Sequence, residues 1–151
     1  MHNLVKFHNK FVDAWQLSLM DLLLLLMRLY VAWIFFRAGL LKLDNWGATQ
    51  YLFQYEYQVP ILPWELAAYL AVATELVVPV FIALGMLTRI TAFVLFVFNI
   101  VAVIAYPTLW SDGFELFSKG AMDHQIWGVM LMVLVLCGAG RWSLDKMLGF
   151  R

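Results

Sequence analysis

The sequence predicts an all-α integral membrane protein that forms a four-helix bundle. Hydrophobic residues make up 64% of its 151 residues and charged residues 13%, whereas a soluble domain is about 45–50% apolar and about 25% charged. The mean hydropathy is +0.83. Four apolar stretches follow one another along the chain, and each approaches or exceeds the roughly 17–25 residues that cross a bilayer. This composition excludes a water-soluble globule and favours a chain with little mass outside the membrane.

The charge balance and the reactive residues exclude several classes of function. Ten basic and ten acidic residues give a formal net charge of zero, so nothing indicates nucleic acid as a partner. Cys137 is the single cysteine, which rules out an internal disulfide and a CxxC redox motif. The three His residues lack the spacing of metal ligands, and the chain has no phosphate-binding loop and no HExxH motif. We therefore predict no metal, and the catalytic residues stay unknown.

The first two apolar stretches define the first half of the bundle. Residues 1–18 are mildly basic and amphipathic, and we expect them to lie as a helix at the membrane surface. The first crossing helix is expected at residues 19–43 and the second at 64–86. Between them lies an aromatic-rich segment with two prolines, which we expect at the interface with room for one short helix.

The second half of the bundle follows after a tight turn. The third crossing helix is expected at residues 89–106, because Pro107 disfavours helix at the residue before it. A polar loop leads to the fourth crossing helix at residues 122–139, and residues 140–151 form a basic tail. Cytoplasmic loops carry an excess of Lys and Arg, and a count of six against two favours an N-in, C-in orientation. The six are Lys6, Lys10, Arg89, Arg141, Lys146 and Arg151, against Lys42 and Lys119.

Three polar residues fall in the middle of the predicted crossing helices. Arg28 and Asn99 lie about ten residues into the first and third helices, and Glu75 about eleven into the second. At 1.5 Å rise per residue all three are expected near the midplane, where an unpaired charge costs roughly 2.5–3.5 kcal/mol. We therefore predict an Arg28–Glu75 ion pair that shares hydrogen bonds with Asn99. Two interpretations stay open: a structural pair that fixes helix contacts, and a polar pocket for a ligand head group or a proton relay.

His124 begins the fourth crossing helix among aromatic and charged residues expected at the outer end. Because imidazole titrates near neutral pH, His124 is a candidate proton carrier or hydrogen-bond donor to a bound carbonyl group. The alternative is an ordinary polar residue at the interface. The candidate binding groups are therefore Arg28, Glu75, Asn99 and His124.

Three segments are similar to the DoxX family of small membrane proteins. They are RLYVAWIFFRAGLLKL in the first crossing helix, ELVVPVFIALGMLTR at the end of the second, and GAGRWSLD after the fourth. Two positions depart from the family's pattern, namely Arg37 and Pro79. The residues that match the family's pattern are Arg28, Phe35, Gly39, Lys42, Glu75, Gly85, Thr88, Arg89, Gly138, Gly140, Ser143 and Asp145.

The resemblance implies a multi-pass protein of the bacterial or archaeal cytoplasmic membrane. It implies a small inner-membrane subunit of a quinone-linked oxidoreductase system. We expect such a subunit to bind a quinone between its helices and to work with a redox partner protein. Membrane lipid is the other expected partner, and self-association into a homo-oligomer stays open. The alternatives are a non-catalytic anchor or assembly scaffold for a soluble enzyme, and a small-molecule transporter. The transporter is disfavoured because the sequence shows no inverted repeat.

Overall fold

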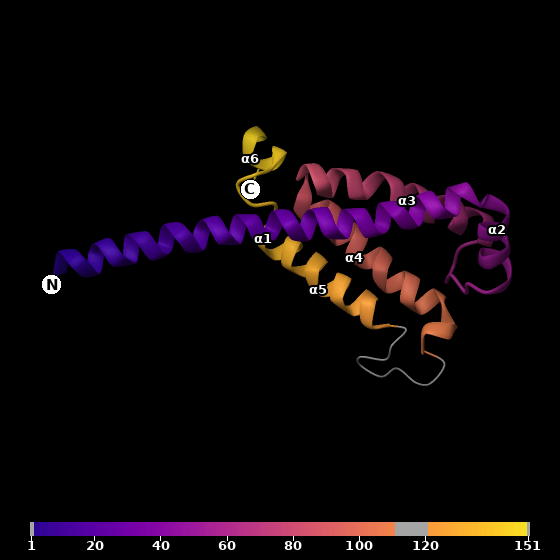
Figure 1. Cartoon of the computed structure of the whole chain (residues 1–151). Helices are drawn as coiled ribbons and strands as arrows, with labels where there is room; N and C mark the ends of the chain where they lie inside the picture. The colour runs from indigo at the N-terminus through magenta and orange to yellow at the C-terminus, as the bar shows by residue number, and fades with distance from the viewer. Residues whose placement is uncertain (1, 111–120, 151) are drawn as a thin grey trace.

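The computed structural model describes the backbone over residues 2–110 and 121–150, and side chains over residues 17–109 and 121–150. Every regular element in these ranges is helical, so the all-α prediction is confirmed. The elements are α1 (His2–Asp44), α2 (Trp46–Tyr55), α3 (Trp64–Leu84), α4 (Thr88–Ala105), the 3₁₀ turn η1 (Pro107–Trp110), α5 (Met122–Cys137) and α6 (Leu144–Leu148). Figure 1 shows α1, α3, α4 and α5 side by side, with α2 at one end of the bundle and α6 at the other.

Three of the helices are long and apolar enough to cross a membrane. They are Leu17–Asp44 within α1, Trp64–Leu84 and Thr88–Ala105. α5 is apolar but shorter, with 16 residues. α3, α4 and α5 cover the stretches where the second to fourth crossing helices are expected, to within two residues at either end.

The expected surface helix at residues 1–18 does not form a separate element. α1 runs without interruption from His2 to Asp44, and its N-terminal part extends away from the bundle (Figure 1). The physical reason is that no Pro or Gly lies between His2 and Arg28, so nothing in the sequence ends one helix and starts another. The expected interfacial helix is therefore not supported.

α1 and α3 are antiparallel and lie in close contact at Gly39. A Cβ atom at Gly39 would lie 3.0 Å from Glu75 Cβ and 3.0 Å from the side chain of Leu76. Small residues permit this close approach between membrane helices. Because the two backbones meet here, Gly39 sets which residues of α1 and α3 lie at the same level.

The bundle core collects buried apolar residues from all four long helices. α1 contacts α3 and α5, and α4 contacts α5. Phe35 packs edge to face on Trp127, with ring centroids 5.6 Å apart. The buried core residues are Leu24, Val31, Ala32, Phe35, Ile82, Ala92, Leu95, Leu131 and Leu134.

Candidate functional site

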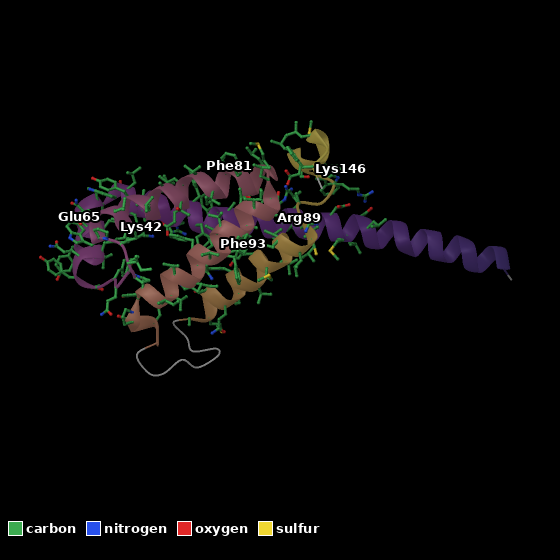
Figure 2. The ribbon with its side chains drawn as sticks, turned by 180° about the vertical axis from the view of Figure 1, so that it is seen from behind. Lys42, Glu65, Phe81, Arg89, Phe93 and Lys146 are labelled. Carbon is green, nitrogen blue, oxygen red and sulfur yellow. The ribbon has the colours of Figure 1, made fainter. Side chains whose placement is uncertain are left out.

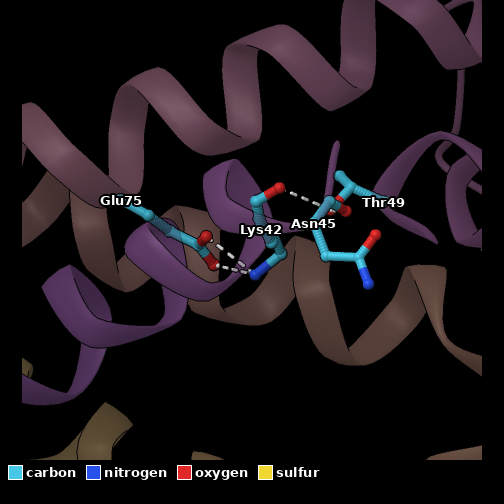
Figure 3. A network of polar contacts seen from close by, with 4 residues as sticks. All are labelled: Lys42, Asn45, Thr49 and Glu75. Carbon is cyan, nitrogen blue, oxygen red and sulfur yellow. Dashed lines mark hydrogen bonds and ion pairs between the residues drawn. The ribbon is translucent and has the colours of Figure 1, made fainter. Parts of the chain in front are cut away.

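Lys42 and Glu75 form an ion pair between α1 and α3. Lys42 Nζ donates to both carboxylate oxygens of Glu75, at 2.8 and 2.7 Å, as Figure 3 shows. The side chain of Glu75 is 6% exposed and that of Lys42 is 22% exposed. A largely buried charge pair is stable only with good geometry, and the two short bonds from one ammonium group provide it.

The backbone around Lys42 is also held in place. Thr49 Oγ1 of α2 donates to the carbonyl oxygen of Lys42 at 2.8 Å and to that of Asn45 at 3.1 Å. Asn45 caps α2 by accepting from the backbone N–H of Ala48 at 3.2 Å. Figure 3 shows Thr49 and Asn45 beside Lys42 and its ion pair with Glu75. The end of α1 therefore cannot turn away without breaking contacts to α2.

The predicted Arg28–Glu75 pair is wrong, because Glu75 pairs with Lys42 and Arg28 lies at the other end of the bundle. Arg28 Nη2 donates to the carbonyl oxygen of Trp142 at 2.6 Å. A Cβ at Gly85 would overlap Arg28 Nη1, so the guanidinium is level with the end of α3.

The misplacement of Arg28 has a simple physical origin. The expected depth of Arg28 in the membrane was counted from residue 19, where the apolar run begins. α1 is helical well before that residue. Gly39 is level with Glu75, and Arg28 and Gly85 lie 11 and 10 residues further towards the same end of the bundle. At 1.5 Å per residue this is about 15 Å along each helix. Arg28 and Glu75 are therefore separated by about that distance.

Asn99 and His124 form a second polar contact, between α4 and α5. Asn99 Nδ2 donates to the carbonyl oxygen of His124 at 2.9 Å, and Asn99 Oδ1 lies 2.8 Å from His124 Nδ1. Because an amide oxygen only accepts, Nδ1 of His124 carries the proton and donates. In the neutral ring Nε2 is then an acceptor, whereas the predicted donor role towards a carbonyl group requires the protonated ring.

A cavity of about 340 Å³ lies between the four long helices on the α2 side of the bundle. We call it the aromatic cavity. Its volume lies within the range of about 300–1,000 Å³ typical of small-molecule sites, which are mostly apolar with few polar groups. The residues that line it are Ile34, Phe35, Ala38, Lys42, Phe53, Tyr57, Val59, Leu62, Ala67, Leu70, Ala71, Thr74, Glu75, Phe98, Val101, Ala102, Ala105, Tyr106, Leu109, His124 and Trp127.

Tyr57 lines the aromatic cavity from the segment between α2 and α3. Its ring packs on Phe53 and Tyr106, with centroids 4.9 and 5.1 Å away, and the next residue, Gln58, donates its N–H to the carbonyl oxygen of Ala105 at 2.7 Å. Burial raises the pKa of the Tyr57 phenol above its usual value, and the nearby Tyr106 and Glu75 add to this. The phenol is therefore a neutral hydrogen-bond donor at physiological pH.

The aromatic cavity brings together only some of the predicted binding residues. Glu75 and His124 line it. Asn99 does not line it but forms a hydrogen bond with the ring of His124. Arg28 does not line it. Sequence reasoning missed the role of Lys42, although Lys42 and Arg28 are 14 residues apart on one face of α1, which is the signal that could have identified it.

The matching residues near the C-terminus form a different structure, which we call the C-terminal junction (residues 85–89 with 138–145). Asp145 accepts from the backbone N–H groups of Leu87 at 2.6 Å and Thr88 at 2.9 Å. Arg89 Nη1 donates to the last carbonyl groups of α5, those of Val135 at 2.8 Å and Leu136 at 2.6 Å. These contacts satisfy backbone groups at the start of α4 and the end of α5.

Two further contacts complete the C-terminal junction. Ser143 caps α6 by accepting from the N–H of Lys146 at 3.2 Å and donates to the carbonyl oxygen of Gly140 at 2.7 Å. Asp21 of α1 forms an ion pair with Arg141 and accepts from its backbone N–H at 2.8 Å. The junction therefore ties the C-terminal segment to α1 and α4.

The chain is similar to a known family and to a relative that is described as uncharacterized. The family model described as DoxX matches residues 23–107. A protein of Haemophilus influenzae, described as uncharacterized, is 30% identical over 130 residues, which cover 83% of this chain and 82% of the relative. No solved structure matches the chain. The range that the family model matches includes both Lys42 and Glu75.

Proposed function

Because the chain belongs to the DoxX family of membrane proteins, we propose that it is a quinone-binding subunit of a membrane oxidoreductase system. The single observation that carries the proposal is the aromatic cavity of about 340 Å³ with its buried Lys42–Glu75 pair. The electrons would come from a redox partner protein, since the residue pattern shows no redox motif of its own.

The walls of the aromatic cavity suit a flat apolar ring. The ring of Phe35 packs edge to face on two others, with its centroid 6.3 Å from that of Phe98 and 5.6 Å from that of Trp127. Aromatic side chains pack favourably against further rings at such separations. A lipid-soluble quinone offers a ring of this kind, and it would be shielded from water between the helices.

The polar groups of the aromatic cavity supply both kinds of hydrogen bond. Lys42 Nζ has three N–H donors, of which two go to Glu75 and one is left for a ligand, and Tyr57 adds a neutral phenol donor. The Nε2 atom of neutral His124 is an acceptor, because Asn99 fixes the proton on Nδ1. Donors match the carbonyl oxygens of a quinone, and an acceptor matches the hydroxyl group of its reduced form. The set therefore suits both redox forms of one ligand.

We further propose that the protein lies in a bacterial or archaeal cytoplasmic membrane with both termini on the cytoplasmic side. Three helices long and apolar enough to cross a membrane, together with the apolar α5, support a multi-pass arrangement. The excess of Lys and Arg at the end that carries α6 supports the orientation. The aromatic cavity would then lie in the outer half of the membrane.

The proposal is tested by titrating the purified protein in detergent with a short-chain ubiquinone analogue and measuring the quenching of Trp fluorescence. Ala102 lines the aromatic cavity from α4, so Ala102→Phe is expected to occupy it and weaken binding at least about tenfold. Val97→Phe is the matched control, because Val97 lies on the same helix, is exposed, and does not line the cavity. It is expected to bind like the wild type.

A second variant tests the polar contacts separately from cavity volume. His124→Phe keeps a flat ring of similar reach and removes the imidazole acceptor, so the reduced ligand should lose more affinity than the oxidised one. Absence of quinone binding in the wild-type protein, or equal binding in Ala102→Phe and Val97→Phe, would overturn the proposed function.

A further inference from the structure

A second hollow lies at the end of the bundle opposite the aromatic cavity. It has a volume of about 400 Å³ and is formed by the start of α4, the end of α5 and the C-terminal segment. We call it the basic hollow. Figure 2 shows Arg89 and Lys146 at this end, and Lys42 and Glu65 at the other. The residues that line it are Leu87, Thr88, Arg89, Ile90, Cys137, Gly138, Ala139, Gly140, Ser143, Asp145, Lys146 and Phe150.

The formal charges around the basic hollow do not balance. Arg89 and Lys146 line it, and Asp145 is the one carboxylate among the described lining residues. Both oxygens of Asp145 already accept backbone N–H groups at the start of α4. A carboxylate at the N-terminus of a helix interacts favourably with the positive end of the helix dipole. The hollow is therefore left with an excess of positive charge.

Arg28 adds a third positive charge just behind the wall of the basic hollow. Its side chain packs on Gly85, where an added Cβ would also lie 2.6 Å from Cβ of the lining residue Ser143. The residue is 1% exposed, and its Nε and Nη1 atoms are buried without a hydrogen-bond partner. The carboxylate of Asp145 is the negative charge that acts on Arg28, but it leaves these two atoms without a hydrogen bond. A buried charge whose hydrogen bonds are incomplete is unfavourable, so a further negative group in the hollow would stabilise the folded protein.

One lining residue also offers an unused polar atom. Thr88 is 0% exposed, and its Oγ1 is buried without a hydrogen-bond partner. In Arg89 only Nη1 carries the hydrogen bonds to α5, while Nε and Nη2 lie 3.4 and 3.6 Å from the position a Cβ at Gly138 would take, at the wall of the hollow. The hollow thus presents a guanidinium edge, and the unpartnered hydroxyl of Thr88 lies buried in its wall; a guanidinium edge of this kind is suited to phosphate oxygens.

We propose that the basic hollow binds the phosphate of an anionic phospholipid headgroup. The place of the hollow favours a lipid over a free phosphate ion. The hollow opens where α4 begins and α5 ends, which is the level expected for lipid headgroups. Its apolar wall includes Ile90 and Phe150, which are both exposed and suit the upper acyl chains. Basic pockets on the cytoplasmic side of membrane helices are known to hold acidic headgroups. The proposal does not depend on the quinone proposal.

The test compares lipid retention in wild-type and variant proteins by native mass spectrometry from detergent, with phosphatidylglycerol and phosphatidylcholine as probes. We expect phosphatidylglycerol to be retained and phosphatidylcholine to be lost. Lys146→Gln removes one exposed charge and should weaken phosphatidylglycerol binding about fivefold, the typical effect of one basic residue near anionic lipid. Lys146→Arg should restore it.

Arg37→Gln is the matched control, because Arg37 is an exposed basic residue on the α2 side of the bundle. It should leave phosphatidylglycerol binding unchanged. Thr88→Val removes the buried hydroxyl at constant volume and should also weaken binding. Equal retention of the two lipids, or equal effects of Lys146→Gln and Arg37→Gln, would overturn the proposal. Competition by inorganic phosphate at millimolar concentration would overturn the lipid assignment in favour of a free anion.

Discussion

The two ends of the bundle hold their polar side chains with different kinds of partner. At the C-terminal junction, Asp145, Arg89 and Ser143 are engaged with backbone groups at helix ends. In the aromatic cavity, Lys42, Tyr57 and His124 line open space. The junction therefore joins helix ends through side-chain contacts to the backbone, whereas in the cavity Lys42 and His124 pair with the side chains of Glu75 and Asn99. A polar residue that matches the family's pattern can therefore hold a helix end or line the cavity, and only its contacts show which of the two it does.

The largest expected effect comes from Gly85 in the C-terminal junction. Gly85 has φ of +68°, where L residues are strained, and a Cβ there would overlap Arg28 Nη1. Gly85→Ala should lower the free energy of unfolding by about 3–5 kcal/mol, as expected when a buried charged contact is broken. Circular dichroism during denaturant unfolding in detergent measures it.

Gly47 provides the control for this substitution. A Cβ at Gly47 in α2 would meet no atom within 4 Å, so Gly47→Ala should stabilise the protein by about 0.5–1 kcal/mol. Equal unfolding midpoints for the two variants would show that the junction does not depend on close packing at Gly85.

The Lys42–Glu75 pair should give the next largest effect and would sharpen the contrast with the junction. Glu75→Leu leaves Lys42 without its partner and should cost about 3 kcal/mol, the lower end of the range for broken buried pairs. The double variant Lys42→Met with Glu75→Leu should recover most of this loss, because two apolar residues replace both charges.

The same double variant should lose quinone affinity while regaining stability. Unfolding in detergent and the fluorescence titration measure the two properties independently. If the double variant binds the quinone analogue as well as the wild type, the pair is only structural and the contrast between the two ends disappears.

Gly39 should show a smaller cost, which comes from packing alone. A Cβ at Gly39 would lie 3.0 Å from side-chain atoms of Glu75 and Leu76, closer than ordinary van der Waals contact. Gly39→Ala should destabilise the protein by about 1–3 kcal/mol through overpacking. A thermal melt with no decrease in midpoint would mean that α1 and α3 can separate freely at this point.

Ser143→Ala tests the junction with a milder change. The variant removes the N-cap of α6 and the hydrogen bond to Gly140, and should cost about 1 kcal/mol. Quinone titration should be unchanged, since Ser143 does not line the aromatic cavity. An altered quinone affinity would indicate coupling between the two ends.

Tyr57 should give the smallest effect, and only at high pH. Burial raises the pKa of its phenol above the usual value of 10.0, so the neutral form is favoured in the folded protein. Its contribution to stability is therefore full below pH 10 and is lost as the pH rises through the higher folded pKa. Tyr57→Phe should remove this dependence, and unfolding midpoints at a series of alkaline pH values would reveal it.

The helices could be predicted from the sequence, but the pairing of their polar residues could not. α4 ends just before Pro107 as expected, because the residue before proline disfavours helix. Length and apolarity do not identify which part of the long α1 lies inside the bundle. The expected depth of Arg28 was therefore wrong, and with it the choice of partner for Glu75.

The correct partners depend on contacts between distant parts of the chain. Lys42 reaches Glu75 only because α1 and α3 meet at Gly39, and no local pattern encodes that level. Asp145 accepts from Leu87 and Thr88 across 58 and 57 positions of sequence. The matching residues could be recognised one by one, whereas their division into a junction and a cavity required the fold.

The close approach at Gly39 also couples the positions of Lys42 at one end of the bundle and Arg28 at the other. If α1 slid by one helical turn along α3, Lys42 would move about 5.4 Å away from Glu75, and Arg28 would leave Gly85 by the same step. The long N-terminal arm of α1 is part of that same continuous rod (Figure 1). A pull on the arm would therefore be transmitted through the whole bundle and would change the electrostatic surroundings of a ligand on the far side.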